Sequence, residues 1–328
     1  MKRITTSLLV AGLAGAPLTA LAQPVIDGVV DASYGEPLAV QAIQTEFGDV
    51  IDPLLGQNGS ELDAAYAQFD ETNLYLTFTG NLEPNFNKLI VFFDSVAGGE
   101  QVLNPANHPV NFDSRIGNGN ANAWEALGPQ TVINEETQEE EVVPGLTFDA
   151  GFAPDYALMF RRGGGTFDVD YAEMNQTAID ADEFSDIYLG FNNSNDPLLS
   201  ILGPLEGINH DFEVGHNDTN IAGVTGGTEL ADQAAAAAVT TGTEIAIPLA
   251  ALGNPTGDVK VTAFISSGSF DFLSNQFLSS LEVEDFDEDP ETPDNRPNVG
   301  GFYDLSQLPG DQFFTISLGD AAGIIGDY

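Results

Sequence analysis

The stretch AAYAQFDETNLYLTFTGNL, residues 64–82, indicates the fold class. Within it Leu74, Leu76 and Phe78 alternate with residues that tolerate water, which is the period-two pattern of a strand with one buried face. The turn-forming segment 70–73 separates this strand from a second strand-like segment at 65–69. Two such segments joined by a short polar turn predict a β-hairpin.

Similar short segments, bounded by Gly, Asn, Asp or Pro, recur along the chain. They predict further strands at 88–93, 157–160, 167–171, 187–191, 244–249, 259–265 and 313–318. The run 88–93 is apolar almost throughout, which predicts a central strand covered on both faces. One short helix is expected at 231–238, with Asp232 near its start. The pattern predicts an all-β protein, an antiparallel β-sandwich of the jelly-roll type with long acidic loops and little helix.

The N-terminus carries the pattern of an export signal. Lys2 and Arg3 precede a short apolar stretch, and Ala20-Leu21-Ala22 supplies a small-x-small cleavage site. We therefore expect a signal peptide at 1–22 and a secreted mature chain, extracellular, at the cell surface or in the periplasm. No later stretch is long and apolar enough to predict membrane insertion as a helix.

The rest of the chain, 23–328, is expected to form a single sandwich domain. Charged or Pro-rich segments interrupt the strand pattern near 104–144 and 282–298. Core-forming strands are predicted on either side of both segments, so we expect them to be loop excursions of one domain and not linkers between two.

The charge is extreme, with 8 Lys and Arg against 51 Asp and Glu and a formal net charge of −43. Such a surface repels nucleic acid and anionic membranes, which excludes both as partners. It also repels itself, so either saline surroundings must screen it, as in halophilic proteins, or bound divalent cations such as Ca²⁺ must neutralise it. Because the chain has no Cys, it has neither disulfides nor thiolate metal sites.

Several segments carry a family resemblance. Ile26-Asp27-Gly28, followed by Asp31 and Tyr34, resembles the opening strand and turn of the DOMON-like sandwiches related to family-nine carbohydrate-binding modules, and TEIAIPLAALG (243–253) resembles their late strand. NKLIVFFDSVAGGEQ (87–101) and GDVKVTAFISSG (257–268) are similar to uncharacterised exported bacterial proteins of the PEP-CTERM-associated type. The resemblance implies a sandwich fold and a non-catalytic protein that recognises polysaccharide or another cell-surface glycan.

Carboxylates at alternate positions indicate candidate Ca²⁺ ligands. Asp285, Asp287 and Asp289 have the spacing with which a loop converges oxygens on one hard cation. Asp94, which ends the predicted strand 88–93 just before Gly98-Gly99, is a further candidate. Its alternative role is to cap a turn through its own backbone. A solvated acidic loop is the alternative for 285–289.

Exposed aromatic rings are the other candidate binding groups, because they stack on sugar rings. We expect Trp124, Tyr156, Tyr171 and Tyr188 to lie on the surface and to form the ligand-binding platform.

Two further polar patterns receive structural interpretations. Asp168 and Asp170 alternate with apolar residues, which predicts that they line the wet face of a strand. The segment 210–218 contains His210, His216 and several acids, and we favour an exposed loop there over a metal site.

Catalysis finds no support in the sequence. The chain has no Cys nucleophile, no G-x-S-x-G elbow and no H-E-x-x-H helix. The prediction is an exported non-catalytic protein that binds glycan through Ca²⁺-stabilised loops. The alternative is a matrix or surface-layer protein that self-associates through its strands, and a hydrolase is the least favoured reading.

Overall fold

The computed structural model describes residues 23–47, 59–104, 126–134, 137–174, 187–193, 201–202, 210–270, 272–279, 299–300, 303–308 and 310–318. The first sheet contains β1 (Ala39–Val40), β2 (Glu61–Phe69), β3 (Asn73–Asn81), β10 (Ile201–Leu202), β11 (Glu213–Asn217) and β12 (Gly242–Pro248). The second contains β4 (Asn85–Asp94), β7 (Tyr156–Gly163), β8 (Thr166–Glu173), β9 (Ile187–Asn193), β13 (Asp258–Ser266), β14 (Phe272–Leu278), β15 (Val299–Gly300) and β16 (Phe314–Ser317).

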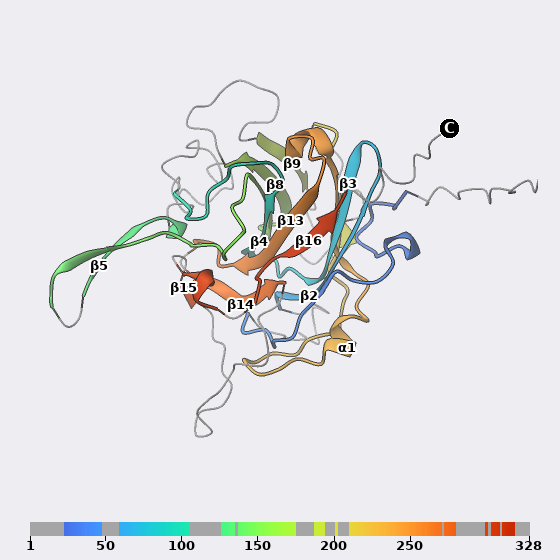
Figure 1. The fold of residues 1–328 in the computed structure, drawn as a ribbon. Coiled ribbons are helices and arrows are strands. Elements are labelled where there is room, and N and C mark those ends of the chain that lie inside the picture. Colours follow the sequence, from blue (N-terminus) through green and yellow to red (C-terminus); the bar gives the residue numbers. More distant parts are fainter. Residues whose placement is uncertain are drawn as a thin grey trace, which may run out of the picture.

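Every strand pair in these sheets is antiparallel, as expected. The first sheet has the order β1-β2-β3-β12-β11-β10, and the second β15-β14-β13-β4-β7-β8-β9, with β16 joined to β13. Sequence neighbours β2 and β3 form the predicted hairpin, whereas β3 takes its second partner, β12, from the far end of the chain. The all-β sandwich is therefore confirmed (Figure 1).

The main core lies between the two sheets. The predicted apolar face of β3, formed by Leu74, Leu76 and Phe78, packs in one cluster with Val91 and Val261 of the opposite sheet. Alternation along both sheets supplies this layer, because every second side chain points inward. Its burial provides the main stabilising term of the fold.

The outer face of the second sheet is buried as well. Ile90 and Phe92 of β4, on the face opposite Val91, pack with Phe148, Phe152 and Leu305 from segments that cross this face. Phe92 and Phe148 meet edge to face, with their ring centroids 4.8 Å apart. The prediction that the apolar run 88–93 is covered on both faces is confirmed.

Helical structure is sparse in the described chain. The α-helix α1 (Gln233–Ala236) is shorter than the predicted segment, and the Asp232 carboxylate caps it by accepting from the backbone amides of Ala234 and Ala235 at 3.0 and 3.2 Å. The described residues also contain the 3₁₀ turns η1 (Ala32–Tyr34), η4 (Leu249–Leu252) and η5 (Leu305–Gln307). Within the residues that the structure describes, no helix has the length and apolarity needed to cross a membrane.

A third, two-stranded sheet stands away from the body of the sandwich (Figure 1). It consists of β5 (Gln130–Ile133) and β6 (Glu140–Val143), within the excursion expected at 104–144. That segment therefore contains strands that the sequence analysis did not predict. The second excursion, 282–298, and the expected signal peptide, 1–22, lie outside the described residues.

Candidate functional site

Two neighbouring arginines on β7 each bind a buried carboxylate. The Arg161 guanidinium donates through Nη2 to Oδ2 of Asp168 at 2.8 Å, across the β7–β8 hairpin. The Arg162 guanidinium forms an ion pair with Asp218 and donates to the carbonyl of Leu82 at 3.2 Å. Leu82 and Asp218 directly follow strands of the first sheet, so Arg162 ties the two sheets together at this end of the sandwich.

Asp218 is fully buried, and its environment changes its acidity. Its Oδ1 accepts the backbone amide of Leu82 at 2.8 Å. Burial raises the pKa of Asp218 from 3.8 to about 7, although Arg162 and the Leu82 amide oppose the change. The ionised form is thus disfavoured inside the protein, because a carboxylate loses its hydration on burial.

His216, two residues earlier, is also buried. Its Nδ1 lies 3.0 Å from Oγ1 of Thr243, and its ring packs against Phe167 with centroids 4.7 Å apart. Burial, and secondarily the charge of Arg162, lowers the pKa of His216 well below 6.5. The neutral imidazole is thus a packed core side chain, in contact with Thr243 and Phe167.

A second group of buried polar side chains adjoins Asp218. Oε1 of Glu61 accepts from the amides of Asn81 and Asn220 at 3.0 and 2.8 Å. The Asn220 amide also reaches Oδ2 of Asp63 at 3.2 Å, and Oδ1 of Asp63 accepts the amide of Val224 at 2.8 Å. We call these residues, with Arg162 and Asp218, the polar end cluster.

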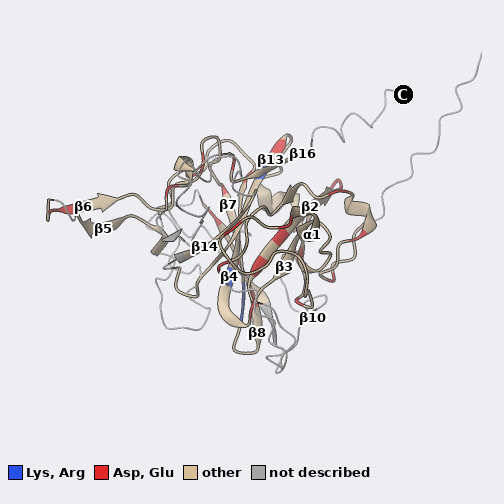
Figure 2. Cartoon of the chain, turned by 90° about the horizontal axis from the view of Figure 1, so that it is seen from below, with Lys and Arg blue, Asp and Glu red and all other residues tan. Residues whose placement is uncertain are grey.

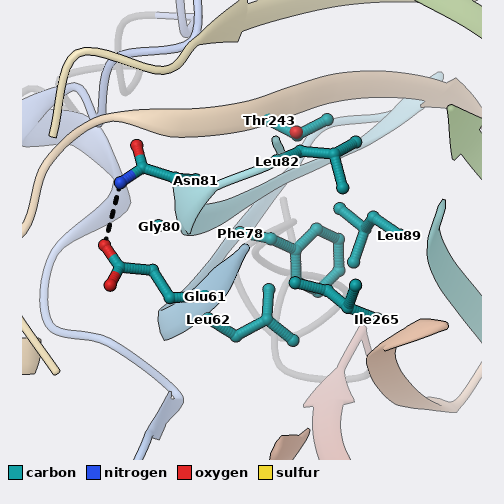
Figure 3. A pocket seen from close by; sticks show the side chains of 9 residues that line it. All are labelled: Glu61, Leu62, Phe78, Gly80, Asn81, Leu82, Leu89, Thr243 and Ile265. Carbon is teal, nitrogen blue, oxygen red and sulfur yellow. Dashed lines mark hydrogen bonds between the residues drawn. The ribbon is translucent and has the colours of Figure 1, made fainter. Parts of the chain in front are cut away.

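A small cavity adjoins this cluster (Figure 3). Glu61 and Asn81 form its polar wall, and Phe78, Leu89 and Ile265 are among its apolar residues (Figure 3). Its volume is about 10 Å³, which has room for no more than one water molecule. A sugar ring does not fit this cavity. The hydrogen bonds of the polar end cluster connect β2, β3 and the segment that follows β11.

A further buried carboxylate holds the N-terminal segment. Oε2 of Glu244 on β12 accepts the amides of Asp27 and Gly28 at 2.9 and 3.0 Å, and its Oε1 accepts the hydroxyl of Tyr34 at 2.8 Å. Gly28 has φ of 79°, and a Cβ there would lie 2.6 Å from the backbone nitrogen of Asn217, so this turn requires glycine. We call this arrangement the N-terminal latch. It brings together the two segments quoted for the resemblance to DOMON-like sandwiches, 26–34 and 243–253.

Of the four basic residues that the structure describes, three lie inside the molecule. Lys88, Arg161 and Arg162 are buried, and Lys260 is one-third exposed, with 33% of its side chain accessible. Figure 2 shows Lys and Arg segments within the body of the sandwich, and Asp and Glu segments both within it and at its periphery, including β6. The two arginines thus neutralise buried carboxylates and leave few basic side chains on the described surface.

Asp94, a predicted Ca²⁺ ligand, has partners within the chain. Its Oδ2 lies 3.8 Å from Nζ of Lys260 and accepts the amide of Ala153 at 3.3 Å. An ammonium group therefore stands where a bound cation was expected. Among the described residues, no three His, Asp or Glu side chains converge to hold a metal ion. Asp285, Asp287 and Asp289 lie outside the described residues.

Two of the four aromatic residues expected to form a surface platform are buried instead. Tyr156 and Tyr171 are buried in the main core with their ring centroids 6.1 Å apart, and the Tyr171 hydroxyl donates to the carbonyl of Ala251 at 2.6 Å. The prediction that they lie on the surface is wrong, because their inward faces oppose the first sheet. Trp124 lies outside the described residues, and for Tyr188 the structure describes the backbone, in β9.

Two other surface predictions are also wrong. Asp168 and Asp170 are buried, since both faces of β8 are covered. His216 lies on β11 with its side chain inside the sandwich, and Asp218 follows it in the interior. A sequence signal for these sites did exist: the adjacent arginines 161–162 directly follow the predicted strand 157–160, in a chain with only 8 Lys and Arg.

The β5–β6 hairpin carries two exposed apolar side chains that could form a contact with another molecule. Ile133 is 55% exposed and Val142 is 69% exposed. Thr131 pairs with Val142 and Ile133 with Glu140, so these four side chains share one face of the hairpin.

Comparison of the chain with family models, with curated proteins and with solved structures found no match. The resemblance to DOMON-like sandwiches therefore stays a prediction.

Proposed function

We propose that this chain is an exported, non-catalytic structural protein of the cell surface or its surrounding matrix, which associates through the β5–β6 hairpin. The observation that supports this most strongly is the hairpin itself, which projects from the sandwich and exposes Ile133 and Val142. The interior charges have structural roles: Arg162 joins the two sheets and Glu244 holds the N-terminal segment.

Sedimentation velocity of the mature chain, in low salt, in molar NaCl and with CaCl₂, tests this proposal. Association that grows with protein concentration and with screening of the negative charge is the expected result. A strictly monomeric protein under all three conditions contradicts it.

Polysaccharide recognition is the second proposal, since the sequence resemblance favours it. It would use Trp124 and Tyr188, of which Tyr188 belongs to β9, the last strand in the order of the second sheet. Co-sedimentation with insoluble polysaccharides tests it, with Trp124→Ala and Tyr188→Ala as variants. Retention that both substitutions abolish would favour this function over the first.

Calcium binding by the loop that contains Asp285, Asp287 and Asp289 is part of the same proposal. A ligand present at one hundred times its dissociation constant stabilises a protein by about 2.7 kcal/mol. Thermal unfolding with Ca²⁺ and with chelator measures this directly. An Asp287→Asn, Asp289→Asn variant that responds to Ca²⁺ like the wild type would exclude this loop.

A further inference from the structure

The β5–β6 hairpin has no third strand among the residues that the structure describes. Isolated two-stranded hairpins are marginally stable in water, and each outer edge offers unpaired backbone groups to another strand. The hairpin is therefore a place where a further strand would add stability.

The two outer edges of the hairpin differ in charge. β6 begins with Glu140 and Glu141, and Glu139 precedes it, whereas β5 has the uncharged sequence Gln130-Thr131-Val132-Ile133. Charged residues on an edge strand oppose pairing with another chain. The outer edge of β5 at Thr131 and Ile133 is thus the one suited to pairing, and in a chain of net charge −43 its lack of charge makes it compatible with an equally acidic partner.

The backbone direction determines which residues of β5 can bond outward. The amide of Asn134 donates to the carbonyl of Glu139 at 2.9 Å, so position 134 bonds toward β6. Bonding direction alternates along an antiparallel strand, so Val132 also bonds toward β6, and the backbone groups of Thr131 and Ile133 point to the free edge.

We propose that β5 pairs antiparallel with β5 of a second copy of this chain, about a twofold axis at Val132. This rests on the proposed function and names the partner and the register. Thr131 and Ile133 of one copy then bond with Ile133 and Thr131 of the other, as their outward groups require, and Val132 faces Val132. The result is a closed four-stranded sheet in the order β6-β5-β5-β6.

This register also separates the acidic side chains. Glu141 is opposite Val132 on β6, so the two Glu141 residues are three strand spacings apart, about 14 Å at ~4.8 Å per strand. That separation exceeds the Debye length of ~8 Å at physiological salt. On the other face, Val142 and Thr131 of one copy lie in a row with Ile133 of the second copy. The exposed apolar side chains of the two copies therefore become neighbours across the sheet.

The pairing between two β5 strands should be weak in dilute solution. Strands of four residues bury much less than the ~1,000 Å² typical of a stable interface, so the contact is weak for dilute molecules and effective when copies are held close together. The two acidic sandwiches repel each other, and salt screens this repulsion, so the pairing should be stronger in high salt.

Single cysteines test the register, since the chain has none of its own. In the proposed sheet Val132 faces itself in a non-hydrogen-bonded pair, whose Cα atoms are about 4.5 Å apart, within the range for a disulfide. Val132→Cys should therefore crosslink to itself under mild oxidation in molar NaCl, at least tenfold faster than the matched control Val142→Cys. Thr131→Cys and Ile133→Cys should crosslink with each other when mixed, and each much less when alone.

The outcomes separate the pairing from the function on which it rests. Equal crosslinking of Val132→Cys and Val142→Cys, with wild-type association in sedimentation, overturns the β5 pairing and leaves the proposed function in place. No association of the wild type in molar salt and no crosslinking of any variant overturns both.

Discussion

The β7–β8 and β5–β6 hairpins differ in what surrounds them. Both are antiparallel pairs that carry charged residues. All of β7 is buried, and its arginines meet carboxylates of the same molecule, whereas β6 is exposed and its glutamates meet solvent. A charged residue within a strand therefore does not by itself indicate whether that strand is buried or exposed.

The comparison shows how this protein distributes its charges. The two arginines of β7 lie where burial makes an unpaired carboxylate costly, at Asp168 and Asp218. Other buried acids, Glu61, Asp63 and Glu244, accept hydrogen bonds from amides or a hydroxyl instead, whereas exposed acids such as those of β6 are screened by counterions. Interior substitutions should therefore change stability, whereas hairpin substitutions should change association.

The largest expected effect comes from removing the cation that joins the sheets. Arg162→Met leaves the Asp218 carboxylate buried without its partner, and the free energy of unfolding should fall by about 3–5 kcal/mol at neutral pH. Urea denaturation of wild type and variant measures the loss.

A double variant sharpens this test. Arg162→Met with Asp218→Leu removes both charges, so it should be more stable than Arg162→Met alone. If the two variants are equally unstable, lost packing and not the uncompensated charge explains the effect.

The second prediction concerns pH. Because the pKa of Asp218 is raised from 3.8 to about 7, the folded state binds more protons than the unfolded state between these values. This group's contribution to stability is thus fully present below about pH 4 and is lost as pH rises toward 7. The expected loss is on the order of a few kcal/mol.

The matched control for this pH effect is Asp218→Asn. The lowered pKa of His216 acts in the opposite sense, since stability is lost as pH falls below 6.5, but His216 is present in both proteins. The stability of the wild type minus that of Asp218→Asn should therefore fall from pH 4 to pH 7. A flat or rising difference would contradict the assignment.

A smaller effect is expected at the N-terminal latch. Tyr34→Phe removes the hydroxyl that Glu244 accepts at 2.8 Å, and a hydrogen bond to a charged group contributes about 1.5–3 kcal/mol. Tyr66→Phe is the matched control, because the Tyr66 hydroxyl donates to the neutral carbonyl of Ala237 at 3.1 Å. Chemical denaturation should show the larger loss for Tyr34→Phe; equal losses would mean that Glu244 is uncharged in the folded protein.

These sites also show how far the sequence could predict the structure. The strands were predictable, because alternation such as that of 74–79 is local. The surroundings of a polar residue were not predictable, because the local sequence around Asp168 is the same whether the side chain faces solvent or pairs with Arg161. Arg162 and Asp218 are 56 positions apart, and Tyr34 and Glu244 are 210 apart, so only the folded sheets reveal these partners.

The smallest effect on stability, and the clearest on association, is expected in the β5–β6 hairpin. Glu140→Thr with Glu141→Thr should change the free energy of unfolding by no more than about 0.5 kcal/mol, since both side chains are exposed. It should also free the edge of β6, so that closed pairs extend into longer assemblies, which light scattering in molar NaCl would detect. Thr131→Glu places a charge on β5 and should have the opposite result, a monomer. If both variants associate like the wild type, the contact lies elsewhere on the sandwich and the contrast between the two hairpins does not extend to assembly.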